Sequence, residues 1–318
     1  MYQFHVIGNP EIYGNIFGVQ TLILRLGVAG CPRPPLPPSF FQTQETRVTT
    51  TPATTDVLAR NNVHVLGNPE GRPVVFAHGF GCSQEIWRNV VPHFTDDYRV
   101  VVFDHVGAGG SDLAAYDRAK YDSLHGYADD ILEIMAALDL SDVAFVGHSV
   151  SAMMGVVASI ADPSRFGTLV LVGPSPRYVD DGDYSGGFSR DDINGLLDSL
   201  DANYLGWSNA MAPVITGNPD RPEVGAELTG LFCSTDPVIA RHFARVTFLS
   251  DNRLDLSQVT VPTVVLQCSE DVIAPAAVGD YVHEHIPAST LVTLAATGHV
   301  PSLSAPDELA AVIRANLA

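Results

Sequence analysis

The chain has 318 residues, of which 46% are hydrophobic and 17% charged, a composition typical of a globular protein with a sizeable core. It carries 36 acidic and 17 basic side chains, a formal net charge of −19. Because so acidic a chain repels phosphate backbones and anionic lipids, we expect neither nucleic-acid binding nor docking on anionic membranes. No run of about 18 uninterrupted apolar residues occurs, so no membrane span is expected.

The first 55 residues differ in amino-acid composition from the rest of the chain. Residues 31–55 are rich in proline and threonine and predict a disordered or low-complexity extension. The apolar stretch before them ends in VAGC at 28–31, which resembles a bacterial lipoprotein cleavage box and would anchor the chain through Cys31. Arg25 interrupts that stretch and no Lys or Arg precedes it, contrary to what a signal peptide needs. The extension is therefore preferred and the lipid anchor is kept as the alternative.

Four cysteines occur, and no two of them have CxxC spacing: Cys31, Cys82, Cys233 and Cys268. Three of them lie after residue 55, an odd number that cannot pair fully. We interpret them as reduced thiols, which favours a cytoplasmic compartment.

From residue 56 onward, short apolar runs rich in β-branched residues recur at 73–79, 98–104, 142–149, 166–173, 262–268 and 290–296. Amphipathic helical stretches lie between several of them. This alternation predicts an α/β fold with a mostly parallel sheet covered by helices on both faces. The alternation breaks over residues 175–255, which predict helices without a strand. We therefore expect a core formed by residues 56–174 and 256–318 and a helical insertion between them.

A serine stands at a predicted turn from a strand to a helix. Residues 147–151 read Gly-His-Ser-Val-Ser, after a predicted strand and before a predicted helix. Such a turn, the nucleophile elbow, lifts the serine hydroxyl out of the sheet and needs small neighbours. Gly147 and Ser151 are small, although glycine is commoner at the position of Ser151. We predict that Ser149 is a nucleophile rather than a helix-capping serine.

A serine nucleophile needs a base, normally a histidine held by a carboxylate. After an elbow of this kind, the acid precedes the histidine in the chain. Asp271 follows the predicted strand 262–268, and His299 follows the predicted strand 290–296. Both lie just past the carboxyl end of a strand, where ligands meet parallel sheets. We predict Asp271 as the acid and His299 as the base. Three competitors are less well placed: Glu270, His283 and His285.

Acyl transfer also needs hydrogen-bond donors for the oxyanion. The backbone N–H of Val150, directly after the nucleophile, is one expected donor. Phe80, in the loop HGFG after the strand 73–79, is the other, and its side chain is expected to wall the pocket. No His, Cys or carboxylate cluster has metal-ligand spacing, so neither a metal nor another cofactor is implied.

Several segments together resemble the RsbQ group of α/β-hydrolases, bacterial regulators of the energy-stress sigma factor pathway, and equally the plant karrikin and strigolactone receptors. The matching segments are AHGFGCSQEIW (77–87), FDHVGAGGSD (103–112), GHSVSAMMGVVAS (147–159), GPSPRYVDDGDYSGGF (173–188), FCSTDPVIARHF (232–243) and VTFLSDNR (246–253). The resemblance covers about residues 56–318. It implies the α/β-hydrolase fold, with residues 175–255 as a helical lid.

The resemblance also implies roles for individual residues. Ser149, Asp271 and His299 match its triad, and Phe80 and Val150 match its oxyanion donors. Phe80, Trp207 and Phe248 fall where lid and core line an apolar pocket. Met211 falls where an aromatic lid residue is usual in the karrikin type. Independently of any family, Trp207 and Met211 are four residues apart and so share one helical face.

Two functions follow as hypotheses. The first is a serine hydrolase of carboxylic-ester type, acting on a small apolar ester, lactone or related acyl compound, with a signalling or stress-regulatory role. The second is a ligand receptor with little turnover that binds a protein partner. In the bacterial case the resemblance implies a phosphatase with a PAS sensor domain as that partner.

Overall fold

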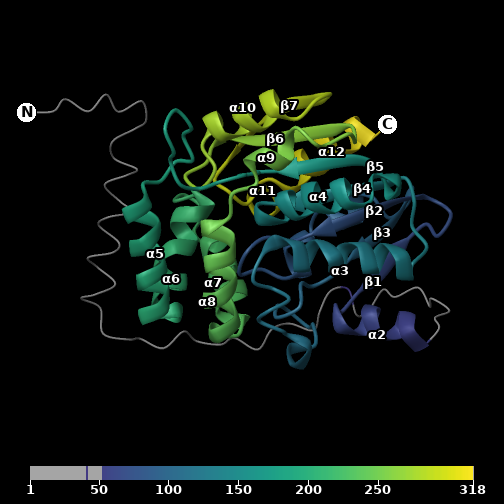
Figure 1. Cartoon of the computed structure of the whole chain (residues 1–318), viewed down its shortest axis with the longest axis horizontal. Helices are drawn as coiled ribbons and strands as arrows, with labels where there is room; N and C mark the ends of the chain where they lie inside the picture. Colours follow the sequence, from purple (N-terminus) through teal and green to yellow (C-terminus); the bar gives the residue numbers. More distant parts are fainter. Residues whose placement is uncertain (1–40, 42–51, 318) are drawn as a thin grey trace, which may run out of the picture.

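A seven-stranded sheet forms the centre of the computed structural model, which describes residue 41 and residues 52–317 (Figure 1). Its strand order is β1-β3-β2-β4-β5-β6-β7, with β1 antiparallel to β3 and every other pair parallel. The strands are β1 His64–Gly67, β2 Arg72–Ala77, β3 Tyr98–Val102, β4 Val143–His148, β5 Phe166–Val172, β6 Thr263–Glu270 and β7 Ser289–Thr297. The prediction of a mostly parallel sheet is confirmed.

Helices connect and cover these strands. They are α2 Pro52–Arg60, α3 Leu124–Ala137, α4 Val150–Ala161, α5 Arg190–Ala202, α6 Tyr204–Thr216, α7 Pro222–Ser234, α8 Pro237–Leu249, α9 Arg253–Leu256, α10 Ala276–His285, α11 Pro301–Ser304 and α12 Pro306–Leu317. Short 3-10 helices lie at Gln84–Trp87, Val91–His93, Leu113–Ala115 and Pro163–Arg165.

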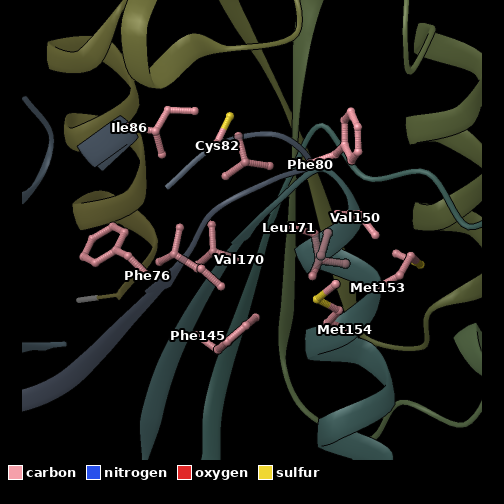
Figure 2. Packing of buried hydrophobic residues seen from close by; sticks show 14 of the residues in the cluster. Phe76, Phe80, Cys82, Ile86, Phe145, Val150, Met153, Met154, Val170 and Leu171 are labelled. Carbon is pink, nitrogen blue, oxygen red and sulfur yellow. The ribbon is translucent and has the colours of Figure 1, made fainter. Parts of the chain in front are cut away.

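The central strand β4 shows why the sheet must be covered on both sides. All six of its residues are buried, and successive side chains of a strand point to opposite faces. Its neighbours supply apolar side chains to the same interior, including Phe76 of β2, Val170 of β5 and Met154 of α4, as Figure 2 shows. These β-branched and aromatic runs form strands because a fully buried pleated surface favours them.

The expected helical insertion consists of the four helices α5–α8, which gather to one side of the sheet in Figure 1. The ends of these helices are defined by capping residues. Ser189 and Asp192 form a reciprocal capping box at the start of α5, and Asp236 accepts hydrogen bonds from the first turn of α8. Gly217 ends α6 in the left-handed conformation that glycine adopts without strain.

The N-terminal boundary differs from the expectation of an extension through residue 55. Helix α2 begins at Pro52, so it crosses that boundary, and Phe41 is fully buried. The start of α2 depends on tertiary packing, because α2 contacts α3 far along the chain. The rest of the expected extension, including the proposed anchor at Cys31, lies outside the described residues.

The cysteines match the expectation of reduced thiols only in part. Cys82 and Cys268 are buried free thiols. Cys233 is disulfide-bonded, which contradicts that expectation at this position.

In the part of the chain that the structure describes, no helix is both long and apolar enough to cross a bilayer.

A buried carboxylate fastens α2 to α3. Asp130 accepts hydrogen bonds from Arg60 at 2.9 Å, Lys120 at 2.6 Å and Tyr121 at 2.9 Å, and its side chain is 1% exposed. Glu133, one turn later, also contacts Arg60, but its side chain is 42% exposed. The two carboxylates therefore share a partner and differ in burial.

Asp130→Ala should lower the free energy of unfolding by about 3 kcal/mol, because it strips two cations of a buried counter-charge. Glu133→Ala is the matched control and should cost less than about 1 kcal/mol, as exposed ion pairs do. Urea unfolding of both variants measures the difference. Equal losses would mean that burial does not decide the strength of this cluster.

Candidate active site

Ser149 occupies a strained turn between β4 and α4. Its backbone has φ 58° and ψ −123°, a conformation that residues other than glycine rarely adopt. Its N–H donates to the carbonyl of Val172 at 2.8 Å, which ties the turn to the end of β5. A side chain at Gly147 would come within 2.5 Å of the Ser151 carbonyl oxygen, so this position needs glycine. The local sequence thus builds the elbow that the motif predicts.

Three predicted residues form one hydrogen-bonded chain. The Ser149 Oγ lies 2.8 Å from His299 Nε2, and His299 Nδ1 lies 2.7 Å from Asp271 Oδ2. The other oxygen of Asp271 accepts from the backbone N–H groups of Ile273 at 2.8 Å and Ala274 at 3.0 Å. The carboxylate is thereby fixed as an acceptor, so His299 Nδ1 carries a proton and Nε2 is free to accept one from Ser149.

The main chain of His299 is held as firmly as its ring. Its N–H donates to the carbonyl of Ile215 at 2.8 Å, and its carbonyl lies 2.7 Å from Nε2 of His148. Ile215 belongs to the last turn of α6, whose carbonyls have no partner within the helix. Burial lowers the pKa of His148 to about 3, so this imidazole stays neutral and donates through Nε2. The insertion and the core therefore position the base together.

The competing candidates do not join this chain. Glu270 is exposed at the end of β6, whereas Asp271 is buried. His283 and His285 lie on α10, where their Nδ1 atoms pair with the hydroxyl of Ser289 and the carbonyl of Tyr281.

A second serine–histidine pair lies close by. Ser151 Oγ is 2.7 Å from His105 Nε2, but it also donates to the carbonyl of His78 at 2.5 Å. Ser151 is completely buried and does not border the cavity at Ser149. Its hydroxyl therefore ties α4 to the end of β2. This structural role explains why serine is tolerated where glycine is common.

The hydroxyl of Ser149 faces a small, largely apolar cavity between the core and the insertion. The space that a water-sized molecule can occupy inside it is about 40 Å³. Its apolar walls include Phe80, Trp207, Ile215, Leu228, Phe232 and Phe248. Phe80 belongs to the core and packs against the insertion, because its ring contacts aromatic rings of α6, α7 and α8 at centroid distances of 5.7–6.1 Å.

Three of the four residues expected at the pocket border this cavity, namely Phe80, Trp207 and Phe248. Met211 is buried in α6 but does not border it. Helix α7 packs closely on α6 and supplies Leu228 and Phe232 to the wall instead. A helical face read from sequence cannot show which of its residues a neighbouring helix covers.

The comparisons with known proteins agree with this geometry. Residues 74–312 match the model of the alpha/beta hydrolase family. This chain belongs to that family. It is 41% identical over 260 residues to a strigolactone esterase from Arabidopsis thaliana, covering 81% of this chain and 97% of the relative. It is 39% identical over 254 residues to a karrikin insensitive 2 receptor from Petunia hybrida, covering 80% and 94%. A hydrolase structure from Oleispira antarctica superposes with a TM-score of 0.81 at 39% identity, covering 85% of this chain and 99% of that one.

One residue at the site of this alpha/beta hydrolase was missed by the sequence reasoning. The hydroxyl of Tyr178 lies 3.5 Å from Ser149 Oγ, and its ring packs on Phe248 at a centroid distance of 5.1 Å. Burial raises the pKa of Tyr178 to about 12, so the phenol is protonated near neutral pH. The available signal was its position in the loop after β5, at the same sheet edge as the other site residues.

The two expected oxyanion donors stand beside the nucleophile. Val150 is the first residue of α4, so its N–H has no carbonyl partner within the helix. Phe80 follows Gly79, where an added Cβ would lie 3.2 Å from the Cβ of Ser149. The HGFG loop can approach the elbow this closely only because Gly79 has no side chain.

Three buried histidines near the site make the stability of this hydrolase depend on pH. Burial lowers the pKa of His78, His105 and His148, the last to about 3. In the unfolded chain each titrates near about pH 6.5. Between these values the unfolded state binds more protons, so the free energy of unfolding falls as pH falls, by about 1.4 kcal/mol per pH unit for each proton.

Urea unfolding between about pH 7 and about pH 5 should show this loss. His148→Gln should make the profile shallower, because one of the three depressed imidazoles is removed. A wild-type stability that is flat through this window would contradict the neutral, buried state of these side chains.

Proposed function

We propose that this protein is a serine hydrolase of carboxylic-ester type, acting on a small apolar ester, lactone or related acyl compound. The observation that carries the proposal is the chain Ser149–His299–Asp271, with distances of 2.8 and 2.7 Å, ending at an apolar cavity. Nucleophile, base and orienting acid have the mutual geometry that acyl transfer requires.

The proposed reaction starts when Ser149 Oγ attacks the acyl carbon and its proton passes to His299 Nε2. Asp271 stabilises the imidazolium that forms, and the N–H groups of Phe80 and Val150 bind the developing oxyanion. His299 then gives its proton to the leaving oxygen. Water, activated by the same imidazole, releases the acid from the acyl-enzyme and restores Ser149.

The cavity restricts the substrate to a compact, mostly apolar compound. Its open space holds only a few solvent-sized groups, so a larger ligand needs the helices above it to move. We propose residues 175–255 as the lid that does so. The bond from His299 N–H to the Ile215 carbonyl fixes the end of α6, so we place the movement elsewhere in the insertion.

The second candidate function is a ligand receptor with little turnover. It is supported by the two relatives described above, one of which is an esterase and the other a receptor. The PAS-domain phosphatase partner belongs to this second proposal, whereas the signalling or stress-regulatory role and membership of the RsbQ group are proposed for the hydrolase. Intact mass spectrometry after incubation with an activated ester distinguishes the two functions. A persistent acyl group on Ser149 favours the receptor, and continuous product release favours the enzyme.

Ser149→Ala should reduce the hydrolysis of para-nitrophenyl acetate by at least about a thousandfold, because only oxyanion binding would remain. Ser159→Ala is the matched control. Ser159 is a buried serine of the same helix α4 whose hydroxyl bonds the Val156 carbonyl, and its loss should leave turnover unchanged. Steady-state kinetics with circular dichroism on both variants decides it. Wild-type turnover in Ser149→Ala would overturn the assignment.

Tyr178→Phe should lower kcat/KM for the same ester by no more than about tenfold, the value of one hydrogen bond, because His299 already orients Ser149. Tyr184→Phe removes a hydroxyl that bonds the Arg177 carbonyl away from the cavity, and serves as control. A loss for Tyr178→Phe as complete as that for Ser149→Ala would make the phenol part of the chemistry.

A further inference from the structure

One polar side chain that borders the cavity has no role in the proposed chemistry. Thr247 lies near the end of α8, borders the cavity next to Phe248 and is 1% exposed. Within the described part of the chain, its hydroxyl is fully buried and has no hydrogen-bond partner. A buried hydroxyl without a partner destabilises the folded state, so it requires an explanation.

The other helical hydroxyls of the insertion show how such groups are normally satisfied. Several bond the backbone carbonyl four residues earlier: Ser199 to Gly195 at 2.9 Å, Ser208 to Tyr204 at 2.8 Å and Thr229 to Gly225 at 2.9 Å. Thr247 has the same opportunity at the carbonyl of Phe243 and does not use it. The hydroxyl therefore lacks the usual backbone acceptor, and the side chain that carries it borders the cavity.

Two other polar residues that border the cavity, Tyr178 and His148, have a partner or a blocked position. Tyr178 is within reach of Ser149, and His148 donates to the carbonyl of His299. The free nitrogen of His148, Nδ1, lies against Gly79, where an added Cβ would be only 2.9 Å away, so no ligand group fits between them. Thr247 thus brings to the cavity a buried hydroxyl that no group among the described residues satisfies.

We propose that Thr247 donates a hydrogen bond to a second oxygen of the substrate, separate from the reacting carbonyl. The inference rests on the proposed hydrolase function and narrows its substrate to compact esters or lactones that carry an ether or carbonyl oxygen elsewhere in the molecule. The ligand group opposite Thr247 should be a hydrogen-bond acceptor, because a buried donor without a partner is rarer in proteins than an acceptor with an unused lone pair.

The position of Thr247 in the fold separates this contact from the reaction itself. The nucleophile, acid and base follow β4, β6 and β7, and the proposed oxyanion donors follow β2 and begin α4. Thr247 comes from α8, whose neighbouring residue Phe248 contacts both Phe80 and Tyr178. The bond would therefore select the substrate rather than stabilise the oxyanion.

Two esters of nearly equal shape test this inference, para-nitrophenyl butyrate and para-nitrophenyl methoxyacetate, which differ by CH₂ against O in the acyl chain. In Thr247→Val, which keeps the shape and loses the hydroxyl, kcat/KM should fall about tenfold for the methoxyacetate, mainly through KM. The butyrate should change by less than about twofold. Comparing each ester with its own wild-type value cancels their different intrinsic reactivities.

Thr247→Ser keeps the hydroxyl and should keep the wild-type preference, which separates hydrogen bonding from packing. Thr263→Val is the matched control, a buried threonine of β6 whose hydroxyl bonds the Val261 carbonyl. It should alter neither ester.

The outcomes distinguish a failure of the hydrolase function from a failure of the role proposed for Thr247. If wild type hydrolyses neither ester in a Ser149-dependent way, the hydrolase function itself fails. If both esters are hydrolysed and Thr247→Val affects them equally, or Thr247→Ser loses the preference, the role of Thr247 is overturned while the hydrolase function stands.

Discussion

The position of His299 depends on four hydrogen bonds, and the rest of the site is arranged around them. Asp271 and Ser149 hold the two ring nitrogens, while Ile215 and His148 hold the main chain. The partners come from β6, the elbow, α6 and the end of β4, so no single segment can place the base alone. The bond to the Ile215 carbonyl ties the end of α6 to the loop that carries His299.

Three buried histidine side chains lie behind the site, and all three are neutral. His78, His105 and His148 are all buried with lowered pKa values, and their hydrogen bonds tie the ends of β2 and β4 to their neighbours. Neutral imidazoles suit this task, because each supplies one donor and one acceptor without the cost of a buried charge. The same arrangement makes the fold sensitive to acid.

The cavity combines aromatic walls with very few polar groups, a pattern in which each polar group carries much of the specificity. Phe80 links the HGFG loop to three helices of the insertion through ring contacts. The Tyr178 hydroxyl lies 3.5 Å from Ser149 Oγ, and the buried Thr247 side chain also borders the cavity. In our proposal, shape and apolar burial limit the size of the ligand, and the Thr247 hydroxyl helps to orient it.

The features that depend on short-range order along the chain could be predicted from the sequence. Buried β-branched runs predicted the parallel sheet, and the Gly-His-Ser-Val-Ser turn predicted the elbow, because strand, turn and helix propensities act over a few residues. Parallel strands also bring their carboxyl ends to one edge, so Asp271 and His299 could be placed near Ser149 in advance. Which side chains are buried at the site depends instead on long-range packing. Packing buried Asp271 while Glu270 stayed exposed, buried Met211 away from the cavity, and brought Tyr178 and Thr247 to it. These outcomes depend on packing between segments distant in sequence, which no local pattern records.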